Sequence, residues 1–351
     1  MSVQNKIDSD MYIREKLEER EIMFLSPYAA KSSKTLGRSR AEELCSIRTE
    51  FQRDRDRVLH SKAFRRLKHK TQVFFSPNDD HYRTRMTHTL EVSQISRTIA
   101  KALNLNEDLT EAIALGHDLG HTPFGHSGES VLNDIMHEGY KHNEQSIRVV
   151  THIEDLNLNK ETLDGILKHT GKDLPITLEG QIVKIADRIA YINHDIQDAL
   201  RAKVILESEL PEDCVAFFSL SHGARLSKMV YDIVENSFDK PEIIMSEECS
   251  HYLVKLRAWM FKHVYYNSIA KSEEDKAKNL IKRLFEYYCS LLEKQFDQSD
   301  RLLIERTAAD YISGMTDRYA LMKFEEIFLP MPLKITSHDE FLLKLAKMNG
   351  L

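Results

Sequence analysis

Histidine and acidic side chains crowd into one short stretch of the sequence, residues 116–129. The dipeptide His117-Asp118 is followed by HTPFGHSGE, which contributes His121, His126 and Glu129. Neutral imidazole and carboxylate are the ligand types of a borderline divalent ion such as Mn, Fe, Ni or Zn, whereas Mg and Ca sites are usually all oxygen. The stretch therefore predicts half of a metal site, and the other ligands must come from elsewhere in the chain.

An HD dipeptide alone is weak evidence for a metal site, and this chain contains a second one, His194-Asp195. The setting of His117-Asp118 is more informative, because it closes a predicted helix and Gly120 follows as a plausible helix terminus. Adjacent helix residues point about 100° apart, so a His-Asp pair can flank one ion only from a helix end that faces a cleft.

Two further ligand candidates lie on neighbouring predicted helices. His88 begins one apolar helix, and Asp187 lies in the middle of a longer one, within QIVKIADRIAYI. A carboxylate flanked by isoleucines is costly to bury without a cation or strong hydrogen bonds. The alternative is that Asp187 pairs with Arg188 or Lys184 on a solvated helix stripe.

The elements that must position these residues are helices. Glycine and proline are few, at 12 and 8 of 351 residues, and apolar residues recur every three or four positions. We expect helices over 88–103, 108–119, 178–200, 224–238, 250–267, 272–295 and 340–348. The fold should be all-α.

The histidines also indicate how the chain is organised, since eleven of the sixteen lie between His60 and His169. We expect a helical segment over 1–60 that packs on the core, a catalytic core over 61–210, and a helical region over 211–351. No Gly/Ser-rich or Pro-rich linker separates these parts, so they should form one compact body.

Composition excludes several classes of protein. The chain has 49 Lys and Arg against 55 Asp and Glu, and this net charge of -6 argues against a surface that grips nucleic acid throughout. The N-terminus is charged and has no signal-peptide core, and no apolar run is long enough to span a membrane. Four widely spaced cysteines fit a reducing compartment, so we expect a cytoplasmic protein.

Six segments, in order, resemble one known family. They are RDRDRVLHSKAFRRLKHKTQVF, RTRMTHTLEVSQI, GHDLGHTPFGHSGE, HNEQS, ADRIAYINHDIQDA and DYISGMTDRYAL. Together they resemble the deoxyguanosine triphosphate triphosphohydrolase branch of the HD-domain phosphohydrolases, over residues 26–321. Six motifs in the right order are far more specific than any one of them.

The resemblance implies an HD-domain helical core with additional C-terminal helices and a divalent metal ion, with Mn, Mg, Fe, Ni and Zn all left open. The implied ligands are His88, His117, Asp118 and Asp187. The implied reaction is hydrolysis of deoxynucleoside triphosphates (dNTPs) to deoxynucleoside and inorganic triphosphate, by attack at the α-phosphorus. Such a triphosphoric monoester hydrolase would regulate dNTP pools.

The leaving group of this reaction is an alkoxide, so a proton donor of near-neutral pKa is needed. His126 is the candidate, and Glu129, three residues later on a helix, can fix its tautomer and raise its pKa. His121 and His142 match family positions that face the phosphates or assist catalysis. The alternatives are a capping or structural His126, and an HNEQS segment that merely starts a helix near Asn143.

Five more residues match substrate-binding positions of the family. Arg85 and Arg188 lie next to the metal ligands, where a guanidinium can meet phosphate oxygens. Tyr191 resembles a residue whose ring packs under deoxyribose, and Gln72 resembles one that contacts the 3′ hydroxyl. Asp195 should then contact the sugar end of the substrate.

A basic run precedes these motifs, with interleaved aspartates, and is usually a solvated helix face. The other interpretations are contact with substrate phosphates and a nucleotide site at a subunit interface. Its members are Arg53, Arg55, Arg57, Lys62, Arg65, Arg66, Lys68 and Lys70. The family resemblance implies a homo-oligomer, tetramer or hexamer, with a nucleotide activator at subunit contacts.

Other functions stay open at this stage. One is a different HD-superfamily activity, a phosphomonoesterase or guanosine tetraphosphate hydrolase. Another, from a different class, is a nucleotide-sensing module or a weak binder of single-stranded nucleic acid. Release of inorganic triphosphate separates the leading hypothesis from both. The base preference cannot be predicted.

Overall fold

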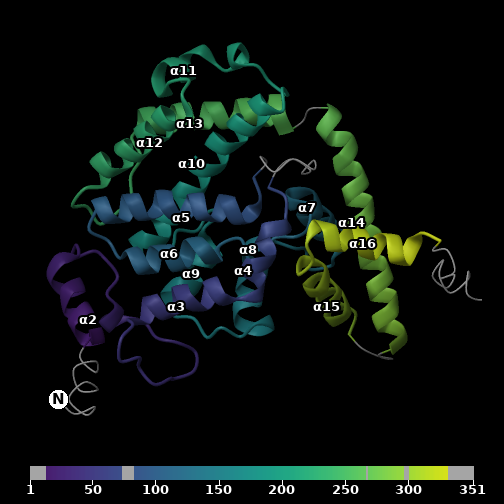
Figure 1. The fold of residues 1–351 in the computed structure, drawn as a ribbon, viewed down its shortest axis with the longest axis horizontal. Coiled ribbons are helices and arrows are strands. Elements are labelled where there is room, and N and C mark those ends of the chain that lie inside the picture. The colour runs from purple at the N-terminus through teal and green to yellow at the C-terminus, as the bar shows by residue number, and fades with distance from the viewer. Residues whose placement is uncertain (1–12, 73–82, 266–267, 296–299, 331–351) are drawn as a thin grey trace, which may run out of the picture.

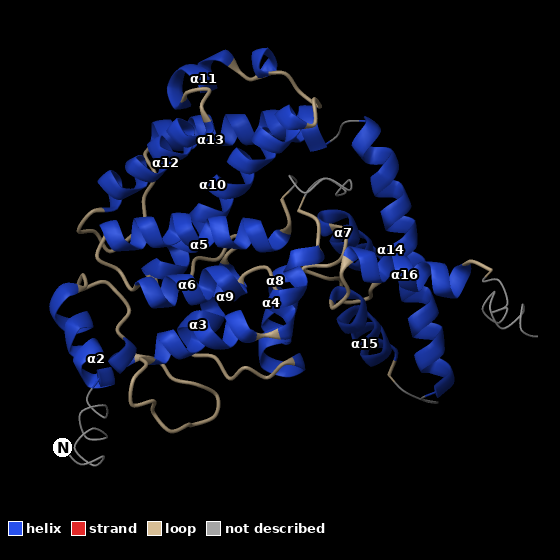
Figure 2. Ribbon diagram, viewed as in Figure 1, coloured by secondary structure: helices blue, strands red, loops and turns tan. Residues whose placement is uncertain are grey.

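The molecule is built from helices and loops, and no strand occurs in the segments that the structure describes (Figure 2). The all-α prediction is confirmed. The structure is a computed structural model that describes residues 13–72, 83–265, 268–295 and 300–330. The helix predicted over 340–348 lies outside these residues.

Three helices form the centre of the fold (Figure 1). They are α5 (Arg85–Ala102), α6 (Glu107–Gly116) and α10 (Leu178–Arg201), and each packs against the other two. Val92 and Ile95 of α5 meet Ile189 of α10 in one buried cluster, which gives the apolar stripes of both sequences a common core.

These helices agree with the predictions over 88–103, 108–119 and 178–200, with one informative difference. The helix α6 ends at Gly116, so His117 is its C-cap residue and Asp118 lies in the following turn. The HD dipeptide therefore projects from a helix terminus, which frees two adjacent side chains from the 100° separation of a regular helix.

Further helices pack on both sides of this centre. On one side lie α3 (Glu50–His60), α4 (Lys62–Arg66), α8 (His142–Arg148) and α9 (Lys160–Lys168). They enclose a second apolar cluster that includes Val58, Leu67 and Ile166. On the other side lie α11 (Glu212–Phe218), α12 (His222–Ser237) and α13 (Glu247–Met260), which extend the central cluster. The first helix described, α2, covers Ile13–Phe24.

The last helices of the described chain pack against a helix from its first half. The helix α7 (Gly125–Ile135) shares a third apolar cluster with α14 (Ser268–Gln295), α15 (Arg301–Ser313) and α16 (Asp317–Phe328). Figure 1 shows these four helices together at one side of the molecule. Because α7 begins at Gly125, the last residue of the HTPFG segment, the C-terminal helices lie beside the predicted catalytic residues.

The helices α12, α13 and α14 agree with the predictions over 224–238, 250–267 and 272–295, since α13 continues into a short π-helix, Phe261–Tyr265. The central cluster includes residues on both sides of position 210, such as Ile196 and Met229. The boundaries at 60/61 and 210/211 remain predictions.

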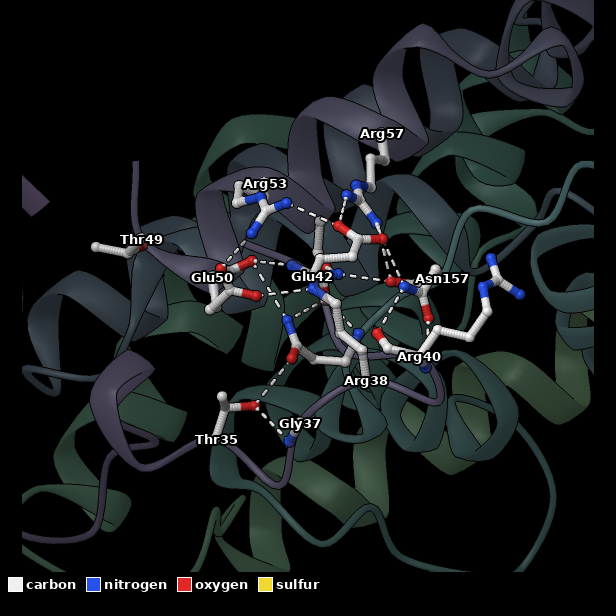
Figure 3. A network of polar contacts seen from close by, with 12 residues as sticks. Thr35, Gly37, Arg38, Arg40, Glu42, Thr49, Glu50, Arg53, Arg57 and Asn157 are labelled. Carbon is white, nitrogen blue, oxygen red and sulfur yellow. Dashed lines mark hydrogen bonds and ion pairs between the residues drawn. The ribbon is translucent and has the colours of Figure 1, made fainter. Parts of the chain in front are cut away.

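Part of the basic run belongs to an internal polar network (Figure 3). Arg38 donates to Glu50 at 2.7 Å and to Asp54 at 2.5 Å, and Asp54 is fully buried. Arg53 pairs with Glu50 and Glu42, and Arg57 also pairs with Glu42. These α3 arginines are therefore not a freely solvated face, because the loop before α3 folds back over them.

Candidate active site

A cavity of about 520 Å³ opens where the central helices meet α13 and α14. Most of the side chains singled out from the sequence line it together. These are Gln72, Arg85, His88, Asp118, His121, His126, His142, Asp187, Tyr191 and Asp195. His117 and Glu129 lie directly behind this lining, in contact with it. Arg188 is exposed and is not part of the lining.

The four predicted metal ligands converge from three elements. In the first turn of α5, His88 Nε2 lies 3.1 Å from Asp187 Oδ1. The Nδ1 of His117 donates to the Ala114 carbonyl at 2.6 Å, so its Nε2 carries the lone pair. That Nε2 lies 3.6 Å from Asp118 Oδ2 and 3.8 Å from Asp187 Oδ1.

These distances fit a metal ion. Bonds of about 2.0–2.2 Å place neighbouring ligand atoms about 3.0–3.5 Å apart. The Nε2 of His117 is buried and has no hydrogen-bond partner within the described part of the chain, as expected of a ligand atom. His88, His117 and Asp118 also have ligand atoms within 4.8 Å of one another. This cluster can hold a divalent metal.

Both carboxylates of the cluster are held ionised. Burial would raise the pKa of Asp187, but the hydrogen bond with His88 and the neighbouring imidazoles lower it below its ordinary value. Burial would also raise the pKa of Asp118. The charge of the neighbouring Arg85 guanidinium acts against burial, and the pKa of Asp118 lies well below its usual range. Ionised carboxylates are the form that binds a cation.

Arg85 is a buried cation with unused donors. Its Nη1 donates to Asp118 Oδ2 at 2.7 Å, while Nε and Nη2 have no partner among the residues described. A Cβ on Gly125 would come within 3.2 Å of Nη2 and 2.9 Å of the Gln72 carbonyl, and Gly125 has a φ of +58°. The HTPFG turn therefore needs glycine, and it leaves a guanidinium facing the cavity that suits an anion.

Glu129 is surrounded by three imidazoles. It accepts from His142 Nδ1 at 2.8 Å and from His126 Nδ1 at 3.4 Å, and His121 Nε2 lies 3.8 Å away. Burial alone would raise the pKa of Glu129, but the hydrogen bonds from His126 and His142 lower it far below its usual range. The His126 side chain is 77% exposed. It is therefore the ring of this group most accessible from solvent.

Residues further along α10 continue the cavity beyond the metal cluster. Tyr191 and Asp195 lie one and two turns after Asp187 and line the cavity, and Gln72 also lines it. Asp198, three residues after Asp195 in α10, instead accepts from Arg83 at 2.7 Å. The row of polar residues that begins at Asp187 thus ends in an ion pair.

Sequence reasoning did not select His169, although it lines the same cavity. It is buried at the C-cap of α9 and lies next to His142. It belongs to no motif, so only the packing of α9 against α8 brings it there. The cavity is also lined by Arg257 of α13 and by Glu274 and Lys278 of α14. Local sequence patterns did not predict these three residues either.

The segment DYISGMTDRYAL supports the active-site turn. At the start of α16, Asp317 accepts from the backbone N–H of Thr71 and of Phe124, both at 2.9 Å, and from the Thr71 hydroxyl. Phe124 has a left-handed backbone with a φ of 61°. Asp317 therefore connects the Thr71-Gln72 segment to the turn that precedes His126.

Comparison with family models supports this assignment of the fold. The HD domain matches residues 85–192, and the phosphohydrolase-associated domain matches residues 243–326. The fold and the His/Asp cluster thus define an HD-domain phosphohydrolase, a class that depends on metal. No helix within the described ranges is long and apolar enough to cross a membrane.

Whole-chain relatives carry one common name, deoxyguanosinetriphosphate triphosphohydrolase-like protein. The relative from Caldanaerobacter subterraneus is 58% identical, with 92% of this chain and 97% of the relative covered. The relative from Clostridium tetani is 47% identical, with 91% and 97% covered, and that from Desulfatibacillum aliphaticivorans is 45% identical, with 92% and 100% covered. A hypothetical protein from Aquifex aeolicus, of known crystal structure, aligns with a TM-score of 0.46 at 18% identity over 85% of this chain and 78% of that chain.

The chain belongs to the family of deoxyguanosinetriphosphate triphosphohydrolase-like proteins. The family predicted from the six motifs is therefore confirmed.

Proposed function

We propose that this protein hydrolyses deoxynucleoside triphosphates to deoxynucleoside and inorganic triphosphate. One observation carries the proposal: a single cavity joins a metal-binding His/Asp cluster, the buried guanidinium of Arg85, and the exposed His126 paired with Glu129. A metal site beside a fixed cation suits a phosphate group, and a histidine beside both suits proton transfer to a leaving oxygen.

The residues that would hold the metal are His88, His117, Asp118 and Asp187. A divalent ion there polarises a phosphoryl oxygen and lowers the pKa of water, which supplies the nucleophile near neutral pH. Two imidazoles with two carboxylates suit Mn, Fe, Ni or Zn better than Mg, which prefers oxygen ligands. Mg remains the comparison ion for the assays.

The remaining roles follow from position in the cavity. Arg85 binds triphosphate oxygens with Nε and Nη2, the donors not used by Asp118. His126, oriented by Glu129, gives a proton to the 5′ oxygen as the α-phosphorus bond to it breaks. The ring of His121 stacks on the ring of His142, with centroids 4.5 Å apart. His121 faces the substrate phosphates beside Arg85 and His126.

The sugar and phosphate ends of the substrate have separate partners. Tyr191 packs under deoxyribose, Gln72 contacts the 3′ hydroxyl and Asp195 binds the sugar end, all from the cavity lining. Arg188 is exposed next to Asp187, so we assign it to the outer, solvent-facing phosphate contacts.

Product analysis tests the proposal. Purified protein is incubated with each of the four dNTPs in Mn or Mg, with His117→Gln as the metal-deficient control. We expect deoxynucleoside and inorganic triphosphate from the parent protein and neither from the control. Pyrophosphate or monophosphate as the only inorganic product would contradict the proposal and favour another HD-superfamily activity.

The same assay addresses regulation. The family resemblance predicts a homo-oligomer with a nucleotide activator, serving control of dNTP pools. Hydrolysis of one dNTP that is stimulated by a second would show activation, and light scattering would give the number of subunits. Binding of single-stranded nucleic acid is less favoured, because Arg53 and Arg57 of the basic run are already ion-paired.

A further inference from the structure

A buried lysine on α10 holds the loop that follows α9. The ammonium group of Lys184 donates to four backbone carbonyl oxygens, those of Asp173 at 2.6 Å, Gly171 at 3.0 Å, Lys168 at 3.1 Å and Thr170 at 3.4 Å. An ammonium has three protons, so at least one of them is shared between two acceptors. All the hydrogen-bond acceptors of this group are carbonyl oxygens of one loop, and none is a carboxylate.

The conformation of this loop depends on a cation. Carbonyl oxygens that converge on one point repel one another, and Lys168 ends α9, where the helix dipole adds partial negative charge. Gly171 has a φ of +77°, a left-handed conformation that suits glycine and reverses the chain direction. Residues 171–174 are exposed, yet the carbonyls of Gly171 and Asp173 turn inward to Lys184. Without the ammonium these oxygens would face one another unpaired.

The same loop carries two residues of the cavity lining, His169 and Thr170. The carbonyl of Thr170 is one of the four acceptors, and that of Lys168 directly precedes His169. The Nε2 of His169 lies 3.1 Å from the Nε2 of His142 across the cavity wall. Fixing the loop therefore fixes what this side of the cavity presents to a substrate.

Lys184 itself does not line the cavity. It lies three residues before Asp187 on α10, so one helix sets the distance between the loop and the predicted metal ligand. A rigid helix that holds the loop by charge and hydrogen bonds keeps both parts of the site in register.

We propose that Lys184 is a positioning residue, whose ammonium acts as a built-in monovalent cation that holds residues 168–173 so that His169 and Thr170 face the cavity. The inference rests on the proposed function for the reaction that this positioning serves. Because the four carbonyls form the binding site for the ammonium, a shortened side chain should leave a site that a small alkylammonium ion can fill.

Chemical rescue tests the proposal. Lys184→Ala removes the atoms of one n-propylammonium ion, and kcat should fall by about 10-fold with KM for dNTP nearly unchanged, because displaced groups in the cavity wall impair the chemical step. Addition of n-propylammonium chloride at constant ionic strength should restore most of the lost kcat. n-Propanol, which has a similar shape and no charge, should not. All rates are measured well below the unfolding temperature of the variant.

Two further variants separate charge from packing. Lys184→Met has a side chain of similar length without the charge, so it should show the same loss of kcat but no rescue, because the methionine fills the space that propylammonium needs. Lys172→Ala removes an exposed lysine from the same loop and should match the parent protein. Propylammonium should leave the parent protein unaffected.

A parental kcat in Lys184→Ala and Lys184→Met, even with lowered stability, would overturn the proposal and make Lys184 an ordinary structural residue. Loss of kcat that propylammonium does not restore in Lys184→Ala would also contradict it. If Lys184→Ala does not fold, Lys184→Met decides alone, since a normal kcat would overturn the proposal and a lower kcat with unchanged KM would support it.

The two proposals fail separately. A protein that releases no triphosphate from any dNTP removes the proposed function, and Lys184 is then tested by hydrogen exchange. The Ile176 N–H, further along the loop, donates to Asp164 at 2.7 Å. This amide should exchange faster in Lys184→Ala and more slowly again with propylammonium. Exchange equal to that of the parent protein would remove the role of Lys184, whatever the activity.

Discussion

At the scale of single residues, Glu129 accepts from His142 and His126 and lies near His121, and of these three imidazoles only His126 is largely exposed. His126→Ala should therefore lower kcat by about 100-fold or more, the usual contribution of a general acid, because no other ring of this group reaches the leaving oxygen as freely. Bound Mn should be unchanged, since His126 is not one of the four residues that would hold the metal. Steady-state kinetics together with metal analysis check this.

The matched control is His152→Ala, which removes an exposed histidine outside the cavity and should leave kcat unchanged. Retention of full activity by His126→Ala would show that the proton comes from elsewhere. Loss of metal would mean that His126 is a ligand.

Local sequence patterns can predict only some of the residues of this site. The prediction of His88, His117-Asp118 and Asp187 as metal ligands rests on the helix-end position of the HD dipeptide, on the isoleucines around Asp187, and on the family resemblance. His169 could not be predicted, because it ends a short helix and is ordinary until α8 places His142 against it. The Arg85 donors that have no partner within the described segments could not be predicted either, since they depend on the left-handed turn at Phe124 and Gly125.

At the scale of elements, the loop before α3 is held by Glu42, which pairs with Arg53 and Arg57. The hydrogen bond with Arg57 lowers the pKa of Glu42 from 4.5 to about 2. A carboxyl whose pKa is lower in the folded state stabilises the protein above its unfolded pKa, and this stability is lost as the pH falls toward the folded value. The relevant window is therefore pH 4.5 down to about 2.

Glu42→Gln should lower the free energy of unfolding by about 1 kcal/mol at pH 7, a value reduced for solvent screening. The deficit should shrink by more than half at pH 3, and urea denaturation at the two pH values measures it. Glu43→Gln is the control, because the Glu43 side chain forms no ion pair within the described chain. A deficit that does not change with pH would assign the role of Glu42 to packing.

The first residue of α16, Asp317, accepts hydrogen bonds from both Thr71 and Phe124. Asp317→Asn keeps one acceptor oxygen and places an NH₂ group against a backbone N–H, so the active-site turn should shift. We expect kcat to fall by about 10-fold to 100-fold with Mn binding retained, since small displacements of catalytic groups have effects of this size.

Asp300→Asn changes the same residue type at the start of α15, where Asp300 accepts from Leu302 N–H at 2.9 Å. It should lower stability slightly and leave kcat unaltered. If Asp317→Asn lost only stability as well, with normal kcat, Asp317 would be an ordinary helix-end residue and not a positioning residue.

At the scale of the whole molecule, the C-terminal helices complete the cavity as well as supporting the core. Apolar spacing predicted α13 and α14 as helices, and their matched family model is a phosphohydrolase-associated domain. No local pattern indicates that Arg257 and Lys278 line the cavity, because that depends on how α13 packs on α10 and how α14 packs beside α7. Long-range packing of this kind leaves no periodic signature.

This arrangement predicts a binding role for α14. Lys278 brings a positive charge to a cavity that would hold a triphosphate, so Lys278→Ala should raise KM for dNTP by about 10-fold, or about 1.4 kcal/mol, with a smaller change in kcat. Salt screens such an attraction, so KM of the parent protein should rise more steeply with ionic strength than KM of the variant. Lys282→Ala, one turn later on an exposed position, should match the parent protein in both respects. An unchanged KM in Lys278→Ala would mean that α14 closes the cavity without contacting the substrate.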